Sequence, residues 1–88
     1  LSEQGRVSAN VIHRALAAAH LAPSVDIAQE IIDSTLATES GFKRDYSVII
    51  DEDSFEIGSD QTRNKRAIIA GWVDEVRLID NMKMGERR

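Results

Sequence analysis

The sequence contains no cysteine and one proline, and its aromatic residues are one Trp, one Tyr and two Phe in a chain of 88 residues. The absence of cysteine excludes disulfides and thiolate sites, and it is compatible with the cytosol, where we expect the protein to be located. With so few aromatic side chains, Ile, Val, Leu and Ala must fill most of the core. The length is sufficient for one small domain with a modest core.

Positive charge and long apolar runs are also scarce. Lys and Arg number 11 against 15 Asp and Glu, and the formal net charge is -4. A negative chain repels phosphate backbones, so we expect no nucleic acid among its partners. No apolar run approaches the roughly 20 residues of a membrane-spanning helix, so we also expect no membrane partner. The hydrophobic fraction of 42% is that of an ordinary globular protein.

Two amphipathic helices are predicted in the first half of the chain. Ser2 suits the N-cap of the first helix, whose apolar residues recur on one face over residues 11–19. Ser24 suits the N-cap of the second helix, whose apolar stripe covers residues 27–36. The residues expected to end the two helices are Pro23 and, in a left-handed conformation, Gly41.

Three strands are predicted in the second half of the chain. The segment 46–50, YSVII, is rich in aromatic and β-branched residues, which favour strands. The apolar segments 66–73 and 76–80 are predicted to form a hairpin. The charged tail, residues 83–88, is expected to fray.

Two connections between the predicted strands are less regular. Asp74 and Glu75 form the link of the hairpin, where Gly or Asn is preferred, so this turn is either strained or built differently from the common types. The polar segment 51–65 is predicted to be a loop, with Phe55 and Ile57 as anchors or as a short extra strand.

Helices followed by antiparallel strands predict an α+β fold with two layers. We expect two N-terminal helices packed on one face of a three-stranded antiparallel sheet, with Val73 and Val76 on either side of the hairpin link. The residues expected to be mostly buried are Val11, Ala15, Ile27, Ile31, Ile32, Val48, Ile50, Ile69 and Leu78.

Two groups of side chains contain residue types that can bind a metal ion. His13 and His20 lie about two helical turns apart, too far to share one metal without further ligands, so solvated surface histidines are the simpler interpretation. Asp51, Glu52 and Asp53 crowd carboxylates after a strand, but their spacing does not fit an EF-hand loop. A solvated acidic turn is favoured there, and we expect no metal ligand in this chain.

The remaining candidates are basic and aromatic. Arg63, Lys65 and Arg66 form a small basic cluster, for which a charged strand entry is favoured over an anion site. Trp72 is flanked by apolar residues and is expected to pack on the sheet, with an exposed binding aromatic as the alternative. No glycine-rich phosphate loop and no Ser-His-Asp arrangement is recognisable. We therefore predict no catalytic or cofactor-binding residue, and we interpret the chain as a packing or lid module.

Four segments resemble the C-terminal part of the pantothenate synthetases, the pantoate–β-alanine ligases. RAIIA at residues 66–70 and RLIDNM at residues 77–82 resemble the two strands that end the family's sequences. DYSVIIDEDSF at residues 45–55 is similar to an upstream strand, and LSEQGR at residues 1–6 is similar to a helix entry. The sequence departs from the family pattern at Asp74, Val76 and Glu52, where the family favours Gly, Thr and Pro.

The resemblance implies an ATP- and magnesium-dependent ligase that condenses pantoate with β-alanine through a pantoyl-adenylate. In such an enzyme, residues 1–88 are the C-terminal lid domain, which closes over the active site. The partners that the resemblance implies are the enzyme's own N-terminal nucleotide-binding domain, the substrates pantoate and β-alanine, and a second subunit in a homodimer. That N-terminal domain, with its His-x-Gly-His and Ser-Ser-Arg-Asn segments, has no counterpart in these residues, so we expect this stretch to be inactive alone.

The alternative is a stand-alone α+β module that binds a protein partner. A reading frame that starts directly before Leu1 would favour this alternative. Upstream Ser-Ser-Arg-Asn and His-x-Gly-His segments would favour the ligase.

Overall fold

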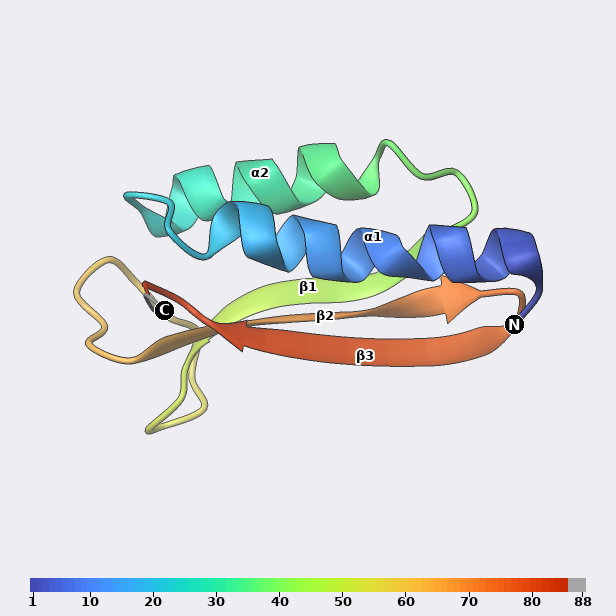
Figure 1. The fold of residues 1–88 in the computed structure, drawn as a ribbon. Helices are drawn as coiled ribbons and strands as arrows, with labels where there is room; N and C mark the ends of the chain where they lie inside the picture. Colours follow the sequence, from blue (N-terminus) through green and yellow to red (C-terminus); the bar gives the residue numbers. More distant parts are fainter. Residues whose placement is uncertain (86–88) are drawn as a thin grey trace.

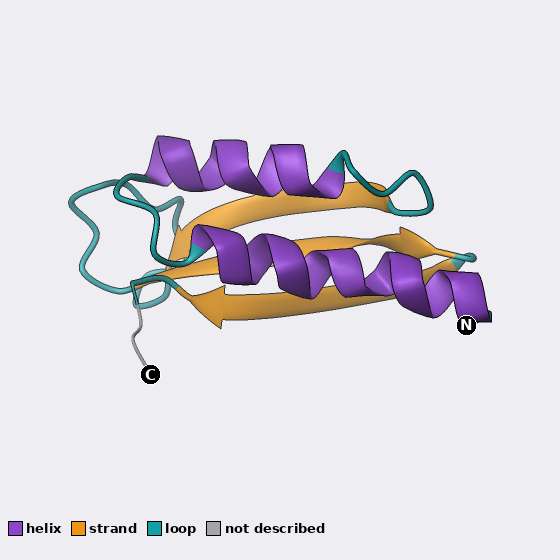
Figure 2. Cartoon of the chain, turned by 45° about the horizontal axis from the view of Figure 1, so that its top comes forward, coloured by secondary structure: helices purple, strands orange, loops and turns teal. Residues whose placement is uncertain are grey.

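The computed structural model describes residues 1–85, which form two layers (Figure 1). The first layer consists of the helices α1 (Glu3–Ala19) and α2 (Val25–Leu36). The second is a sheet of the strands β1 (Lys43–Asp51), β2 (Lys65–Val73) and β3 (Val76–Lys83), which are antiparallel in the order β1-β2-β3. Both helices lie on the same face of the sheet (Figure 2). The predicted α+β fold class is confirmed.

Both helices begin at the predicted caps. The side-chain oxygens of Ser2 and Ser24 accept hydrogen bonds from the backbone N–H groups of Gly5 and Ile27, which satisfies donors that the first helical turn leaves unpaired. None of the helices among the described residues is long and apolar enough to cross a membrane.

The prediction that Gly41 ends the second helix in a left-handed conformation is wrong. The helix α2 ends at Leu36, where Ala37 caps it in a right-handed conformation, and a turn follows. Gly41 has a different role, since a Cβ atom there would overlap the Ser8 hydroxyl and lie 3.1 Å from its Cβ. This glycine allows the α2–β1 connection to cross closely over α1.

The strands are longer than predicted. The strand β1 starts at Lys43 and contains an irregularity between Arg44 and Tyr46, which places Asp45 as an extra residue opposite β2. The strand β3 continues to Lys83, so this part of the tail does not fray as predicted. Residues 86–88 of the predicted tail lie outside the described residues.

The β2–β3 link is strained. This was one of the two alternatives predicted for it, the other being a turn built differently from the common types. Val73 and Val76 pair as predicted, and the two residues between them, Asp74 and Glu75, have φ values of 52° and 67°. Positive φ at both central residues defines the tight type I′ hairpin turn, which Asn and Gly adopt most readily. Both acidic residues are therefore held in a conformation that is costly for a residue with a Cβ atom.

The core lies between the helices and one face of the sheet. Of the predicted core residues, Val11, Ala15, Ile32 and Ile69 are buried. The half-buried members of the prediction are Ile31, Val48, Ile50 and Leu78. The prediction for Ile27 is wrong, because 42% of its surface is exposed.

The errors in the predicted core follow from which face of each element turns inward. On α2 the buried stripe is Ala28, Ile32 and Leu36, at intervals of four residues, which leaves Ile27 beside it. On β1 the buried residue is Ile49, opposite Ala67 on the helix-covered side of the sheet. Neighbouring residues of a strand point to opposite faces, so Val48 and Ile50 lie on the other side.

Phe55 and Ile57 do not anchor the β1–β2 loop, contrary to prediction. Their surfaces are 78% and 75% exposed. Ile57 forms a single antiparallel bridge with Ile50 rather than a further strand. The loop turns away from the helices at this point, so it offers the two side chains no core to enter (Figure 1).

Candidate functional site

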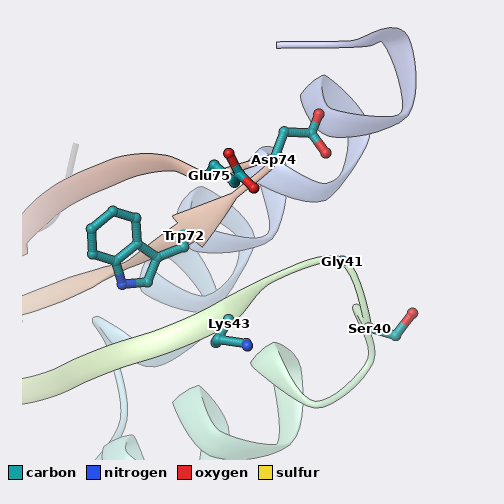
Figure 3. A pocket seen from close by; sticks show the side chains of 6 residues that line it. All are labelled: Ser40, Gly41, Lys43, Trp72, Asp74 and Glu75. Carbon is teal, nitrogen blue, oxygen red and sulfur yellow. The ribbon is translucent and has the colours of Figure 1, made fainter.

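An open hollow lies at the end of the sheet where β2 turns into β3 (Figure 3). Its volume is about 500 Å³. Three separate parts of the chain meet here, namely the α2–β1 connection, the paired strands β1 and β2, and the hairpin turn. The lining residues are Ser40, Gly41, Lys43, Trp72, Asp74 and Glu75.

Asp74 forms one wall of the hollow and also fixes the start of α1. Its Oδ2 atom accepts hydrogen bonds from the Ser2 hydroxyl at 2.7 Å and from the Ser2 backbone N–H at 3.3 Å. These bonds, first that of the hydroxyl and then that of the backbone, hold the pKa of the Asp74 carboxyl below its ordinary value. Gly5 is required beside them, because a Cβ atom there would overlap the Asp74 carboxylate.

Trp72 is the aromatic surface of the hollow. It pairs with Lys43 on β1 and with Arg77 on β3, so the three side chains form a row across the sheet. The Arg77 guanidinium carbon lies 5.9 Å from the centre of the Trp72 ring, within cation–π range. The surface of Trp72 is 40% exposed, so its predicted packing on the sheet is only partial and the alternative of an exposed aromatic describes it better.

Arg77 is held in this row by Asp45, the extra residue of β1. Arg77 Nη2 donates to Asp45 Oδ2 at 2.8 Å. This hydrogen bond, more than any other contact, raises the pKa of the Arg77 guanidinium. The irregularity in β1 thus places a carboxylate where it orients the cation against the indole.

The two histidines lie apart from the hollow and from each other. His13 is exposed on α1, as expected for a surface histidine, whereas His20 is half-buried at the C-terminal end of that helix. The His20 Nδ1 atom is buried and has no hydrogen-bond partner among the described residues. Within residues 1–85, no three His, Asp or Glu side chains are grouped so that they could hold a metal ion.

The acidic run predicted as a solvated turn organises the β1–β2 loop. The Asp51 carboxylate accepts from the backbone N–H of Asp53 at 2.9 Å. Glu52 forms salt bridges to Arg66 at 2.9 Å and to Lys83 at 2.8 Å. The acidic run and the basic strand entry were predicted separately, and the structure brings them together across all three strands.

The ion pairs of Glu52 predict a pH dependence of stability. Hydrogen bonds first from Lys83 and then from Arg66 lower the pKa of Glu52 in the folded chain. A carboxyl with a depressed pKa stabilises the fold above its unfolded value, about 4.3, and this contribution is lost as pH falls through the folded value. The Glu52→Gln variant is therefore expected to lose less stability than the parent between pH 5 and pH 3.

Urea denaturation at a series of pH values measures this difference as the shift of the midpoint. The matched control is Glu30→Gln, which alters an exposed carboxyl of α2. That variant is expected to follow the parent curve. Parallel curves for the parent and Glu52→Gln would contradict the assignment of acid sensitivity to these ion pairs.

The chemical groups that line the hollow are suited to contacts with another surface. Its lining provides an aromatic face, one ammonium group and two carboxylates, of which Asp74 is already occupied by Ser2. Covalent catalysis requires a nucleophile placed against a base, and no pair of lining residues is placed in that way. The arrangement is suited to binding or to packing against another surface.

The fold and the hollow define a small two-layer α+β domain with an open, partly aromatic surface at the end of its sheet. The model of the pantoate-beta-alanine ligase family matches residues 1–83, and the chain belongs to this family. The resemblance noted in the sequence is thereby confirmed.

Solved structures support the same assignment. Two crystal structures of pantothenate synthetase from Thermus thermophilus are similar to this chain, each with 33% sequence identity and a TM-score of 0.87. Each match covers 94% of this chain and 32% of the solved one, so the chain spans about a third of the length of these relatives. A search of curated protein sequences found no match.

Proposed function

We propose that this chain is the C-terminal lid domain of an ATP-dependent ligase that condenses pantoate with β-alanine through a pantoyl-adenylate. The family match over residues 1–83 is the observation that carries the proposal. The solved relatives continue well beyond the matched third, and the proposal assigns the nucleotide-binding part of the enzyme to that remainder. A domain that closes over such a site excludes water from an adenylate that water would hydrolyse.

The carboxylates of the acidic run do not fit a magnesium site. The crowded carboxylates are engaged within the chain, since Asp51 accepts from the backbone, Glu52 pairs with Arg66 and Lys83, and Asp53 accepts from Asn64. The proposal therefore assigns ATP, magnesium and the homodimer contact to the N-terminal part of a cytoplasmic enzyme. This domain contributes a rigid cover.

The first test is an assay of AMP release by purified residues 1–88 with ATP, magnesium, pantoate and β-alanine. We expect no release above a control without protein, because adenylate formation requires a positioned pantoate and cationic groups at the transferring phosphate. The full-length enzyme is the positive control. Deletion of these residues from it is expected to abolish most turnover while nucleotide binding persists. Turnover by the isolated domain would contradict the proposal.

A further inference from the structure

Within the described residues, no helix or strand covers the face of the sheet opposite the helices (Figure 2), and the register places apolar side chains at its centre. Cross-strand pairing places the side chains of Tyr46, Ala70 and Ile79 in one row on this face. The exposed fractions are 39% for Tyr46, 40% for Trp72 and 58% for Ile79. The apolar residues of this face, here called the outer face, are Tyr46, Val48, Ile50, Ile68, Ala70, Trp72 and Ile79.

The β1–β2 loop extends the outer face. The bridge between Ile50 and Ile57 places Ile57 on the same side of the sheet as Ile50, and Phe55 lies two residues before it. The loop projects from the side of the sheet opposite the helices (Figure 1). Hydrogen bonds from Phe55 N to Asp51 O at 2.7 Å and from Asp51 N to Glu56 O at 2.8 Å hold its conformation. Two large apolar side chains are thus presented on a hydrogen-bonded turn.

Three of the cations at the rim of the outer face are paired within the chain. Arg66 and Lys83 share Glu52 at one end, and Arg77 binds Asp45 at the other. These three cations therefore need no compensating charge from a partner. An apolar centre with Trp and Tyr, surrounded by a polar rim, is the composition of a protein interface rather than of a free surface.

We propose that the outer face and the loop tip at Phe55 pack against an apolar, weakly charged surface of the preceding part of the same ligase chain. This inference rests on the proposed function, because it takes these residues as one part of a longer enzyme. In the solved relatives, of which this chain covers 32%, about two thirds of the chain remains to supply that surface. Ser2 is hydrogen-bonded to Asp74, so the N-terminal end of the described residues lies beside the β2–β3 turn, at one end of the sheet (Figure 1).

Photo-crosslinking in the full-length enzyme tests this contact. A benzophenone amino acid is placed at Phe55 or at Ile79, and the matched control carries it at Leu21, which is 53% exposed in the α1–α2 connector. After illumination, we expect mass spectrometry to find Phe55 and Ile79 linked to residues that precede this domain in the same chain. Leu21 is expected to form no such link.

Each other outcome overturns the inference. A crosslinked dimer joined through Phe55 or Ile79 would assign the outer face to a second copy. Absence of crosslinks from both positions, or equal crosslinking from Leu21, would show that this face makes no specific contact. AMP release by the same preparations separates the two proposals. Crosslinks in a protein without ligase turnover would support the proposed interface but not the ligase activity. Turnover without crosslinks would support the ligase activity alone.

Discussion

Replacing Ile69 by alanine is expected to lower the free energy of unfolding by about 2–5 kcal/mol. Ile69 is completely buried on the central strand, on the side of the sheet that the helices cover. Removing its outer carbons forfeits the transfer free energy of the side chain and leaves a cavity that the packed helices close only in part. For a domain whose total stability is about 5–15 kcal/mol, this is a large share.

The matched control is Ile79→Ala, which removes the same atoms from the opposite face of the sheet. Ile79 is 58% exposed, and we expect it to cost about 1 kcal/mol or less in the isolated domain. The free energies come from urea denaturation, provided that the slope against denaturant is unchanged. Equal losses for the two variants would contradict the assignment of the core to the helix-covered face.

Gly71→Ala is expected to destabilise the domain by about 1–3 kcal/mol or more, although alanine suits a strand better than glycine. A Cβ atom at Gly71 would overlap the Cζ atom of Phe42 and lie 2.6 Å from the carbonyl oxygen of Lys43. Phe42 is buried, and the carbonyl belongs to the neighbouring strand, so neither can move away freely. The melting temperature is expected to fall by about 4–8 °C for each kcal/mol lost.

A double-mutant cycle identifies the source of this loss. Phe42→Leu removes the ring atoms nearest to the new methyl group, so the combined variant is expected to lose less than the sum of the two single losses. The contact with Lys43 remains, and rescue is therefore expected to be partial. Additive losses would show that the Phe42 ring is not the obstacle.

The elements of the fold could be predicted because their signals are local. Ser2 and Ser24 cap helices by reaching only a few residues along the chain, and β-branched residues favour extended backbone wherever they cluster. The end of α2 could not be predicted from Gly41. A glycine can serve either a left-handed turn or a close approach, and only the position of Ser8 shows which of the two applies.

The choice of buried face was ambiguous on β1 for a physical reason. The run Val48-Ile49-Ile50 is apolar on both sides of the strand, so the alternation that identifies an inward face is missing. The uncovered apolar face causes this ambiguity. In a sheet with one solvent-exposed face, this strand would have carried polar residues at positions 48 and 50.

The hollow and the contacts that support it could not be predicted from sequence patterns. Glu52 meets Arg66 and Lys83 only because three strands align in one register, and Trp72 meets Arg77 for the same reason. The unusual link at Asp74 and Glu75 was one available signal, because non-glycine residues in a tight turn indicate a constraint from elsewhere. For Asp74, that constraint is the start of α1.

The hydrogen bonds of Asp74 join it to a residue 72 positions away, whereas the helices and the successive strands join close neighbours along the chain. Closing so long a loop costs chain entropy that the hairpins do not incur, so we expect this contact to form after them, late in folding. Interactions that are absent from the transition state slow unfolding and leave the folding rate nearly unchanged. We therefore expect the contact between Ser2 and Asp74 to lengthen the lifetime of the folded domain rather than to hasten its formation.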